Sequence, residues 1–155
     1  MKRRLYILVT GTRYAHVENL ADIDRAISGE MDSKRYDSIE IVVGDADGVD
    51  ALVRRWFHGA PVIQQPRTGW RADWDTHGKK AGPIRNQLMI DYVRENFETR
   101  ASDDAIVVGF PASNYKSNGT KGCLKAAKTA GLPTIEIPIE IDLAVVRGER
   151  ERFSF

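Results

Sequence analysis

Three short segments of the chain combine glycine with residue types that bind phosphate or sugar groups. Residues 9–13 read Val-Thr-Gly-Thr-Arg, residues 44–50 read Gly-Asp-Ala-Asp-Gly-Val-Asp, and residues 113–122 end in Gly-Thr-Lys-Gly. Glycine lets the backbone approach a ligand closely, hydroxyl and backbone N–H groups donate hydrogen bonds to phosphate, and arginine offers a fixed pair of donors. We therefore expect phosphate contacts from Gly11, Thr12, Arg13, Gly119 and Thr120.

The second of these segments places three carboxylates around two glycines. The glycines allow its backbone N–H groups to face an anion. The carboxylates can instead hold ribose hydroxyls or Mg²⁺, act as catalytic acids or bases, or cap the following helix. Capping accounts for one aspartate but not for three. The candidates in this segment are Gly44 and Gly48 for ligand binding and Asp45, Asp47 and Asp50 for sugar contacts or catalysis.

A long stretch without periodicity, residues 67–80, is rich in Trp, Asp, Gly and Arg and is followed by a predicted helix. Loops of this length in a compact domain usually serve a function or lack order. Trp74 can stack on a base or act only as a packing lid, and Asp73 can accept a hydrogen bond from a sugar or base or serve in catalysis. Arg85, followed by Asn86, is the candidate to reach a phosphate.

Five apolar runs alternate with stretches of helical spacing, and we predict the runs as strands and the stretches as helices. The predicted strands are 5–10, 39–43, 61–66, 105–110 and 134–137. The predicted helices are 17–27, 49–57, 84–97 and 121–130. Such alternation implies right-handed βαβ units. It predicts an α/β fold, a Rossmann-like three-layer sandwich with a mostly parallel sheet of about five or more strands, in which ligands bind at the carboxyl ends of the strands.

Composition and charge place further bounds on the function. The 155 residues are expected to form one domain, with a core at about 5–138 and a C-terminal extension at 139–155. The net charge of +1 creates no overall field for nucleic acid, which is therefore not an expected partner. Cys123 is the only cysteine, which excludes an intrachain disulfide and a cysteine-built zinc site. No apolar run approaches the ~20 residues of a spanning helix, so we expect a cytoplasmic protein without membrane contact.

The order of these motifs resembles the SLOG superfamily, in its YspA-like, cpYpsA-related branch. The matching segments are 10–13, 44–50, 72–74, 78–86 and Gly119-Thr120, within a resemblance that runs from about Leu5 to Ile137. The resemblance implies a Rossmann-like domain that binds nucleotides or nucleotide-derived signals. It also implies a homo-oligomer, because members commonly pair through helices.

A more distant similarity is to the LOG-type phosphoribohydrolases, which cleave the base from a nucleoside monophosphate. Residues 85–89, Arg-Asn-Gln-Leu-Met, are similar to their Arg-Lys-x-x-Met motif and nominate Arg85 for substrate contact. Their phosphate loop, Pro-Gly-Gly-x-Gly-Thr, is followed by a glutamate two residues after the threonine. Here residues 111–113 replace the double glycine, an insertion precedes Gly119-Thr120, and Gly122 occupies the glutamate position. The resemblance therefore supports a phosphate site. Hydrolysis of the glycosidic bond would need a different carboxylate, because the glutamate is missing.

The sequence leaves three functions open, and with them the question of whether the protein is an enzyme. The first is the binding of a nucleotide or nucleotide-derived ligand, as in a sensor. The second is an N-glycosidic hydrolase of a nucleotide, with Asp45, Asp47, Asp50 or Asp73 replacing the missing glutamate. The third is a Mg²⁺-dependent phosphatase, because residues 45–49 resemble the Asp-x-Asp-Gly-Thr/Val nucleophile motif of haloacid dehalogenases. That motif should follow the first strand, however, and here it follows the second. Mg²⁺ is the one cofactor considered, and no metal ligands are assigned.

Overall fold

A computed structural model describes residues 3–31, 35–56, 63–64, 70–99 and 102–154. Its strands form one parallel sheet in the order β3-β2-β1-β4-β5. The strands are β1 (Arg4–Gly11), β2 (Ser38–Val43), β3 (Ile63–Gln64), β4 (Asp104–Phe110) and β5 (Thr134–Glu136). Four of them have three residues or more, so the expected five strands are reached only by counting the two-residue β3. Most of the strand predicted at 61–66 lies outside the described residues.

Helices occupy the connections between the strands, and two begin earlier than the sequence pattern predicts. The α-helices are α1 (Leu20–Glu30), α2 (Val49–Trp56), α3 (Trp74–His77), α4 (Ala81–Glu98), α5 (Asn118–Thr129) and α6 (Leu143–Val146). Short 3₁₀ turns, η1 (Val17–Asn19) and η2 (Gly78–Lys80), precede α1 and α4. Pro83 lies inside the first turn of α4, where backbone N–H groups have no intrahelical acceptor, so a proline is tolerated there. Helix α5 likewise begins at Asn118 and includes Gly119 and Thr120 in its first turn.

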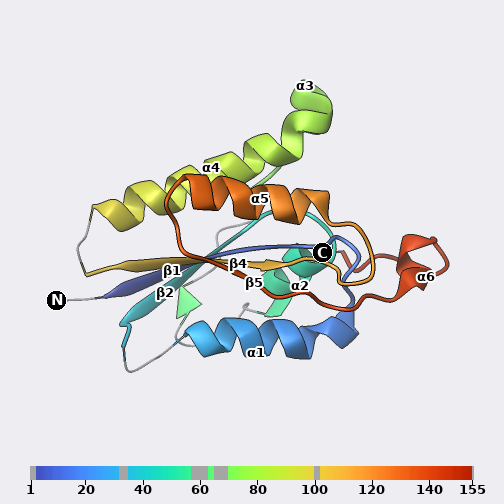
Figure 1. The fold of residues 1–155 in the computed structure, drawn as a ribbon, viewed down its shortest axis with the longest axis horizontal. Helices are drawn as coiled ribbons and strands as arrows, with labels where there is room; N and C mark the ends of the chain where they lie inside the picture. Colours follow the sequence, from blue (N-terminus) through green and yellow to red (C-terminus); the bar gives the residue numbers. More distant parts are fainter. Residues whose placement is uncertain (1–2, 32–34, 57–62, 65–69, 100–101, 155) are drawn as a thin grey trace.

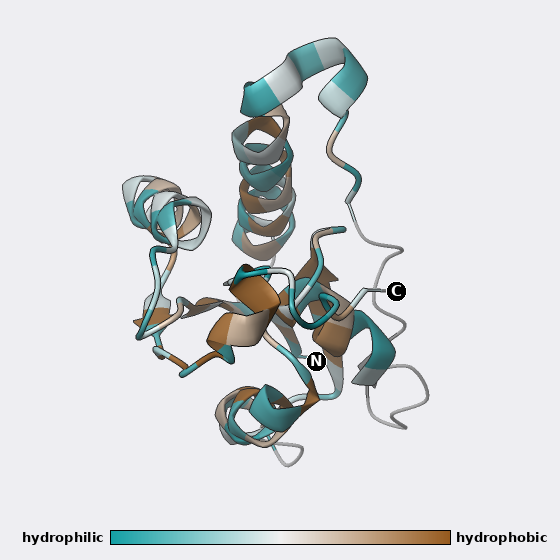
Figure 2. Cartoon of the chain, turned by 90° about the vertical axis from the view of Figure 1, so that its right-hand side faces the viewer, coloured by the Kyte–Doolittle hydropathy of each residue, from teal (hydrophilic) through white to brown (hydrophobic). Residues whose placement is uncertain are grey.

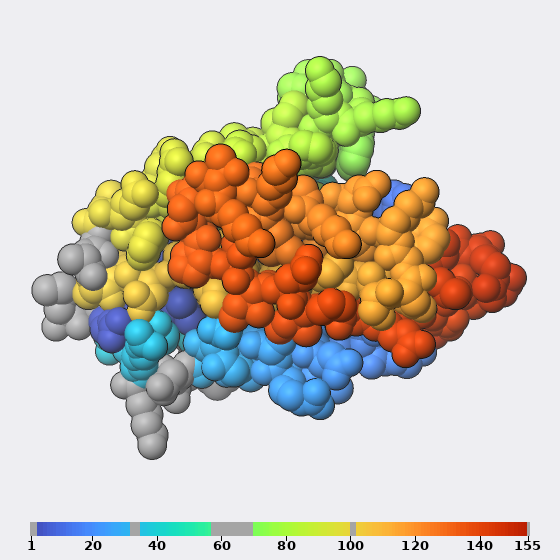
Figure 3. Space-filling model, viewed as in Figure 1, coloured from blue at the N-terminus to red at the C-terminus, as the bar shows by residue number. Residues whose placement is uncertain are grey.

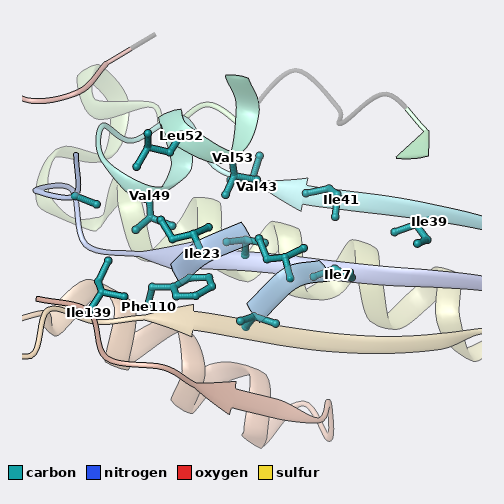
Figure 4. Packing of buried hydrophobic residues seen from close by; sticks show 14 of the residues in the cluster. Ile7, Ile23, Ile39, Ile41, Val43, Val49, Leu52, Val53, Phe110 and Ile139 are labelled. Atoms are coloured by element: carbon teal, nitrogen blue, oxygen red, sulfur yellow. The ribbon is translucent and has the colours of Figure 1, made fainter. Parts of the chain in front are cut away.

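The sheet is covered by helices on both faces (Figure 1). Because successive side chains of a strand point to opposite faces, the residues of β1 divide between two hydrophobic clusters. Ile7 and Val9 pack with α1 and α2 in one cluster, part of which is drawn in Figure 4. Tyr6 and Leu8 pack with α4 and α5 in the other. The result is the expected arrangement of two helical layers around a parallel sheet.

The direction of strand addition reverses between β1 and β4, which are neighbours in the sheet. The helix after β1 covers one face and the helix after β4 covers the other. The two connections therefore part at the carboxyl edge of the sheet, which Figure 2 views end-on. Such a reversal is where open α/β sheets bind ligands. Glycines let the helices approach here, since a Cβ on Gly109 would lie 2.6 Å from Leu124 and one on Gly11 2.5 Å from Val49.

The C-terminal extension packs against this same end of the molecule. Ile139 and Ile141 are buried, and Ile139 forms a parallel bridge with Ala112. The side-chain amide of Asn114 accepts from the Ile141 N–H at 3.0 Å and donates to its carbonyl at 2.9 Å. The carbonyl of Phe153 accepts from the Gly48 N–H at 2.8 Å. The extension thus ties the loop after β4 to the turn after β2. No helix in the described ranges is both long and apolar enough to cross a membrane.

Candidate functional site

A cavity of about 610 Å³ lies at the carboxyl edge of the sheet, where the connections after β1 and β4 part. One wall is the end of β1 and its loop, from Thr10 to Tyr14, and a second is the start of α4, from Gly82 to Gln87. The third is formed by residues 115–120, which lead into α5. This volume lies within the ~300–1,000 Å³ typical of small-molecule sites.

Eight of the ten predicted ligand-binding residues line this cavity. They are Gly11, Thr12, Arg13, Trp74, Arg85, Asn86, Gly119 and Thr120. The other two, Gly44 and Gly48, lie outside its wall. Of the four carboxylates considered for catalysis, Asp50 lines the cavity, whereas Asp45, Asp47 and Asp73 do not. Segments far apart in the sequence therefore meet at one hollow.

The first turn of α5 offers free hydrogen-bond donors to the cavity. Ser117 stands at the N-cap, but its hydroxyl accepts from the buried N–H of Ala112 at 2.8 Å and does not cap the helix. The first bond of the helix runs from the Lys121 N–H to the Ser117 carbonyl. The preceding N–H groups, of residues 118–120, have no intrahelical acceptor, and none donates to a backbone carbonyl elsewhere in the described chain. These donors and the positive end of the helix dipole favour an anion.

Two arginines add positive charge to the same cavity. Arg13 is exposed, lies over the Tyr14 ring at 5.1 Å and makes no ion pair with another described residue. Arg85 is only 8% exposed, and its Nη1 donates to Asp45 at 2.5 Å and to the Trp70 carbonyl at 3.3 Å. Its Nε donates to Asn86 at 2.8 Å. Nη2 of Arg85 has no acceptor among the described residues, which leaves a fixed donor for a ligand.

Asp50 is a buried carboxyl group on the cavity wall. Its side chain is held at the start of α2, where it accepts from the Ala46 N–H at 3.3 Å. Burial raises the pKa of Asp50 to about 6, and the positive charges of Arg85 and Arg54 act in the opposite direction. Desolvation dominates because the carboxylate loses water without gaining a direct ion pair. Asp50 can therefore exchange a proton close to neutral pH at the surface of the cavity.

The rest of the acidic turn holds protein groups. Asp45 pairs with Arg85 and also accepts from the Ala72 N–H at 3.2 Å, while Asp47 pairs with Arg152 at 3.4 Å. These carboxylates therefore fix Arg85, the stretch before α3 and the C-terminal extension. Among the described residues, no three His, Cys, Asp or Glu side chains are grouped to hold a metal ion.

The glycines of this turn make room for protein atoms. Gly48 has a φ of +73°, and a Cβ there would lie 2.4 Å from the Thr12 carbonyl oxygen. Its N–H and that of Val49 donate to the carbonyls of Phe153 and Thr12. A Cβ on Gly44 would lie 2.5 Å from Nη1 of Arg85. The N–H groups of Gly48 and Val49, candidates for an anion cradle, are thus already used.

Asp73 caps a helix that the sequence pattern does not predict. Asp73 is the N-cap of α3, and its Oδ1 accepts a hydrogen bond from the Thr76 N–H at 3.1 Å. Hydrogen bonding with Thr76 lowers the pKa of Asp73. The side chain is exposed and lies outside the cavity wall. Trp74, the next residue, does line the cavity but remains 58% exposed.

Two tyrosines and a cysteine on the wall were missed by sequence reasoning. Tyr14 and Tyr115 are half-buried and meet edge to face, with ring centroids 5.5 Å apart. Tyr14 directly follows Arg13 in a loop already singled out, so the aromatic residue beside the arginine was a usable signal. Tyr115 likewise lies within segment 113–122, which was already singled out. Cys123 carries no such signal, because it reaches the wall only through folding. Burial raises the pKa of Cys123 to about 11, so it remains a thiol.

Fold and site together define an α/β protein with a helix-covered parallel sheet and a cavity, containing two arginines and one carboxyl group, where the strand order reverses. The chain is 31% identical over 137 residues to the Gene 61 protein of Mycobacterium phage D29, across 83% of this chain and 93% of that protein. The chain belongs to the family of this phage protein. No family model matches the sequence, and no solved structure matches it.

Proposed function

We propose that this protein binds a nucleotide, or a nucleotide-derived ligand, in the cavity between the connections after β1 and β4. In this proposal it is a Rossmann-like member of the SLOG superfamily, of the YspA-like branch, and serves as a binding module or sensor. One observation carries the proposal. The unengaged N–H groups at the start of α5 line the same cavity as Arg13 and Arg85.

The phosphate of the ligand would bind at the start of α5. Gly119 and Thr120 contribute N–H groups, Thr120 adds a hydroxyl, and the helix dipole adds positive potential. Arg13 and the free Nη2 of Arg85 complete a donor set for three phosphate oxygens. Among the described residues, Asp50 is the one acidic side chain on the wall, and its raised pKa limits its negative charge near neutral pH.

The base would lie against the aromatic part of the cavity. Tyr14 and Tyr115 present half-buried rings, and Trp74 stands at the exposed rim. Aromatic faces stack on any base, which favours a nucleotide over inorganic phosphate or a sugar phosphate. The edge-to-face tyrosine pair supports base contact more directly than Trp74, whose ring is mostly in solvent.

Binding calorimetry with ribonucleoside 5′-monophosphates, the matching nucleosides and inorganic phosphate tests this proposal. We expect the monophosphates to bind more tightly than either fragment, since both subsites contribute. Arg13→Gln should weaken monophosphate binding by about 10- to 100-fold, the value of one charged hydrogen bond. Arg25→Gln is the matched control, because this arginine is exposed on α1 and lies outside the cavity wall. Nucleosides that bind as tightly as their monophosphates would overturn the phosphate site.

A second candidate function, N-glycosidic hydrolysis, is favoured by Asp50. In this reaction water adds to C1′ of the ribose, the C1′–N bond breaks, and the base leaves with a proton. A carboxylate that ionises near neutral pH on the cavity wall can take the proton from water or stabilise the positive charge at C1′. Chromatography of nucleoside monophosphates after incubation should then show free base, lost in Asp50→Asn and kept in Asp47→Asn. No release from any of the common monophosphates would contradict the hydrolase.

We also propose that the protein acts in the cytoplasm as a homo-oligomer. Its single thiol is buried, and two large apolar side chains, Trp74 of α3 and Leu88 of α4, are exposed at 58% and 52%. The helix α3 projects from the body of the molecule in the space-filling view (Figure 3). Sedimentation velocity tests the oligomer, and a monomer at micromolar concentration would contradict it.

A further inference from the structure

The cavity of the proposed site continues into a second hollow between α4 and α5. This second hollow has a volume of about 390 Å³ and shares Gln87, Gly122 and Ala126 with the first. Its wall also includes Arg94 of α4 and Lys125 of α5. The surfaces of the two helices, yellow for α4 and orange for α5, adjoin in Figure 3. The two hollows therefore adjoin at residues that line both.

The ionisable side chains that line the second hollow in the described chain are both cationic. Arg94 is half-buried, and neither it nor Lys125 forms an ion pair or side-chain hydrogen bond with any other described residue. Asp91, one turn before Arg94, accepts instead from Gln87 at 2.9 Å. Two such cations lining one hollow create a positive potential, which favours the binding of an anionic group there.

The two positive subsites are too far apart for one phosphate. Lys125 follows Gly119 by six residues, and the rise of an α-helix places it about 9 Å further along α5. Gly122 lies between the two subsites along α5, and a Cβ on this glycine would meet no atom within 4 Å, so no side chain separates them there. Two separated anionic groups on one ligand match this arrangement.

We infer that the ligand carries a second anionic group, which lies between α4 and α5 against Arg94 and Lys125. This inference rests on the proposed function and narrows its ligand class to a nucleotide with two separated anionic groups, for which a 5′-phosphorylated dinucleotide is the probe. The 5′-phosphate of this probe binds at the start of α5, and its internucleotide phosphate lies in the second hollow. The site therefore selects a 5′-phosphorylated dinucleotide over a nucleoside monophosphate.

Calorimetry at one fixed salt concentration compares the ribonucleoside 5′-monophosphates with the corresponding 5′-phosphorylated dinucleotides. We expect the best dinucleotide to bind at least about tenfold more tightly than its monophosphate, because it gains charged hydrogen bonds. Arg94→Gln/Lys125→Gln should remove this advantage and leave monophosphate binding unchanged. Lys128→Gln is the matched control, since Lys128 is exposed on α5 and lies outside both hollows. It should change neither affinity. Circular dichroism spectra of the variants verify that each is folded.

The outcomes separate this inference from the proposed function. A dinucleotide that binds no more tightly than its monophosphate overturns the second subsite and leaves the first intact. A dinucleotide advantage that survives in Arg94→Gln/Lys125→Gln also overturns it, because the second phosphate then lies elsewhere. Failure of both ligand classes to bind overturns the proposed function and this inference together.

Discussion

Replacement of Asp50 by asparagine should stabilise the protein at neutral and alkaline pH. Burial raises the pKa of this carboxyl from 3.8 to about 6 in the folded state, despite the nearby positive charge of Arg85. The folded state therefore binds a proton more tightly than the unfolded state between about pH 4 and pH 6, and stability falls as the pH rises through this window. Above about pH 6 the full penalty for the buried charge is present, and below about pH 4 it is absent.

The size of the effect follows from the two pKa values. The two pKa values correspond to a penalty of about 3 kcal/mol at pH 8, and linkage reduces this penalty to about half at pH 5 and to a small fraction at pH 4. Asparagine keeps an oxygen for the Ala46 N–H and removes the charge. For a chain of this length, about 3 kcal/mol raises Tm by roughly 6–12 °C. Asp50→Asn should therefore gain most of its advantage between pH 4 and pH 8.

Urea and thermal unfolding of the wild type and Asp50→Asn at pH 4, 5, 6.5 and 8 measure this dependence. Asp47→Asn is the control, because it removes the same charge from the same turn at a half-exposed position. Its ion pair with Arg152 is near the surface, so its effect should stay below about 1 kcal/mol at every pH. A lower stability of Asp50→Asn at pH 8, or an equal gain at pH 4 and pH 8, would refute the reasoning. Either result would mean that Asp50 is ionised without penalty in the fold.

Further predictions concern the glycines and the serine that shape the cavity wall. Gly48→Ala should cost more than about 3 kcal/mol in urea unfolding, because its φ of +73° and the Thr12 carbonyl both oppose a Cβ. Gly119→Ala should leave stability unchanged or raise it by up to about 1 kcal/mol, since a Cβ there meets no atom within 4 Å and alanine favours the helix; a loss above about 1 kcal/mol would contradict this. Ser117→Ala should cost about 1–3 kcal/mol by leaving the buried Ala112 N–H without its acceptor, and an unchanged Tm would show that water replaces the hydroxyl.

The sequence alone determined the layered α/β architecture and identified eight of its ten predicted ligand-binding residues correctly as part of one cavity wall. Apolar runs such as 5–10 and 105–110 are long, β-branched and separated by helical spacing, so local patterning sufficed to predict the two central strands. Parallel strands bring their carboxyl ends to one edge, and this geometry predicts that Gly11, Gly44, Arg85 and Gly119 share a hollow. All of them except Gly44 line the cavity. Helix boundaries were less predictable, since Gly119 disfavours a helix intrinsically and yet lies in the first turn of α5.

Only the tertiary structure decided what each charged group does. Four aspartates of similar appearance in the sequence have different environments: Asp45 fixes Arg85, Asp47 holds Arg152, Asp73 caps α3, and Asp50 is buried on the cavity wall. A carboxylate's pKa and availability depend on its burial and on partners that are distant in the chain, which residue type and spacing do not encode. The second hollow was likewise decided by the tertiary structure, because Arg94 and Lys125 line one hollow only when α4 packs on α5.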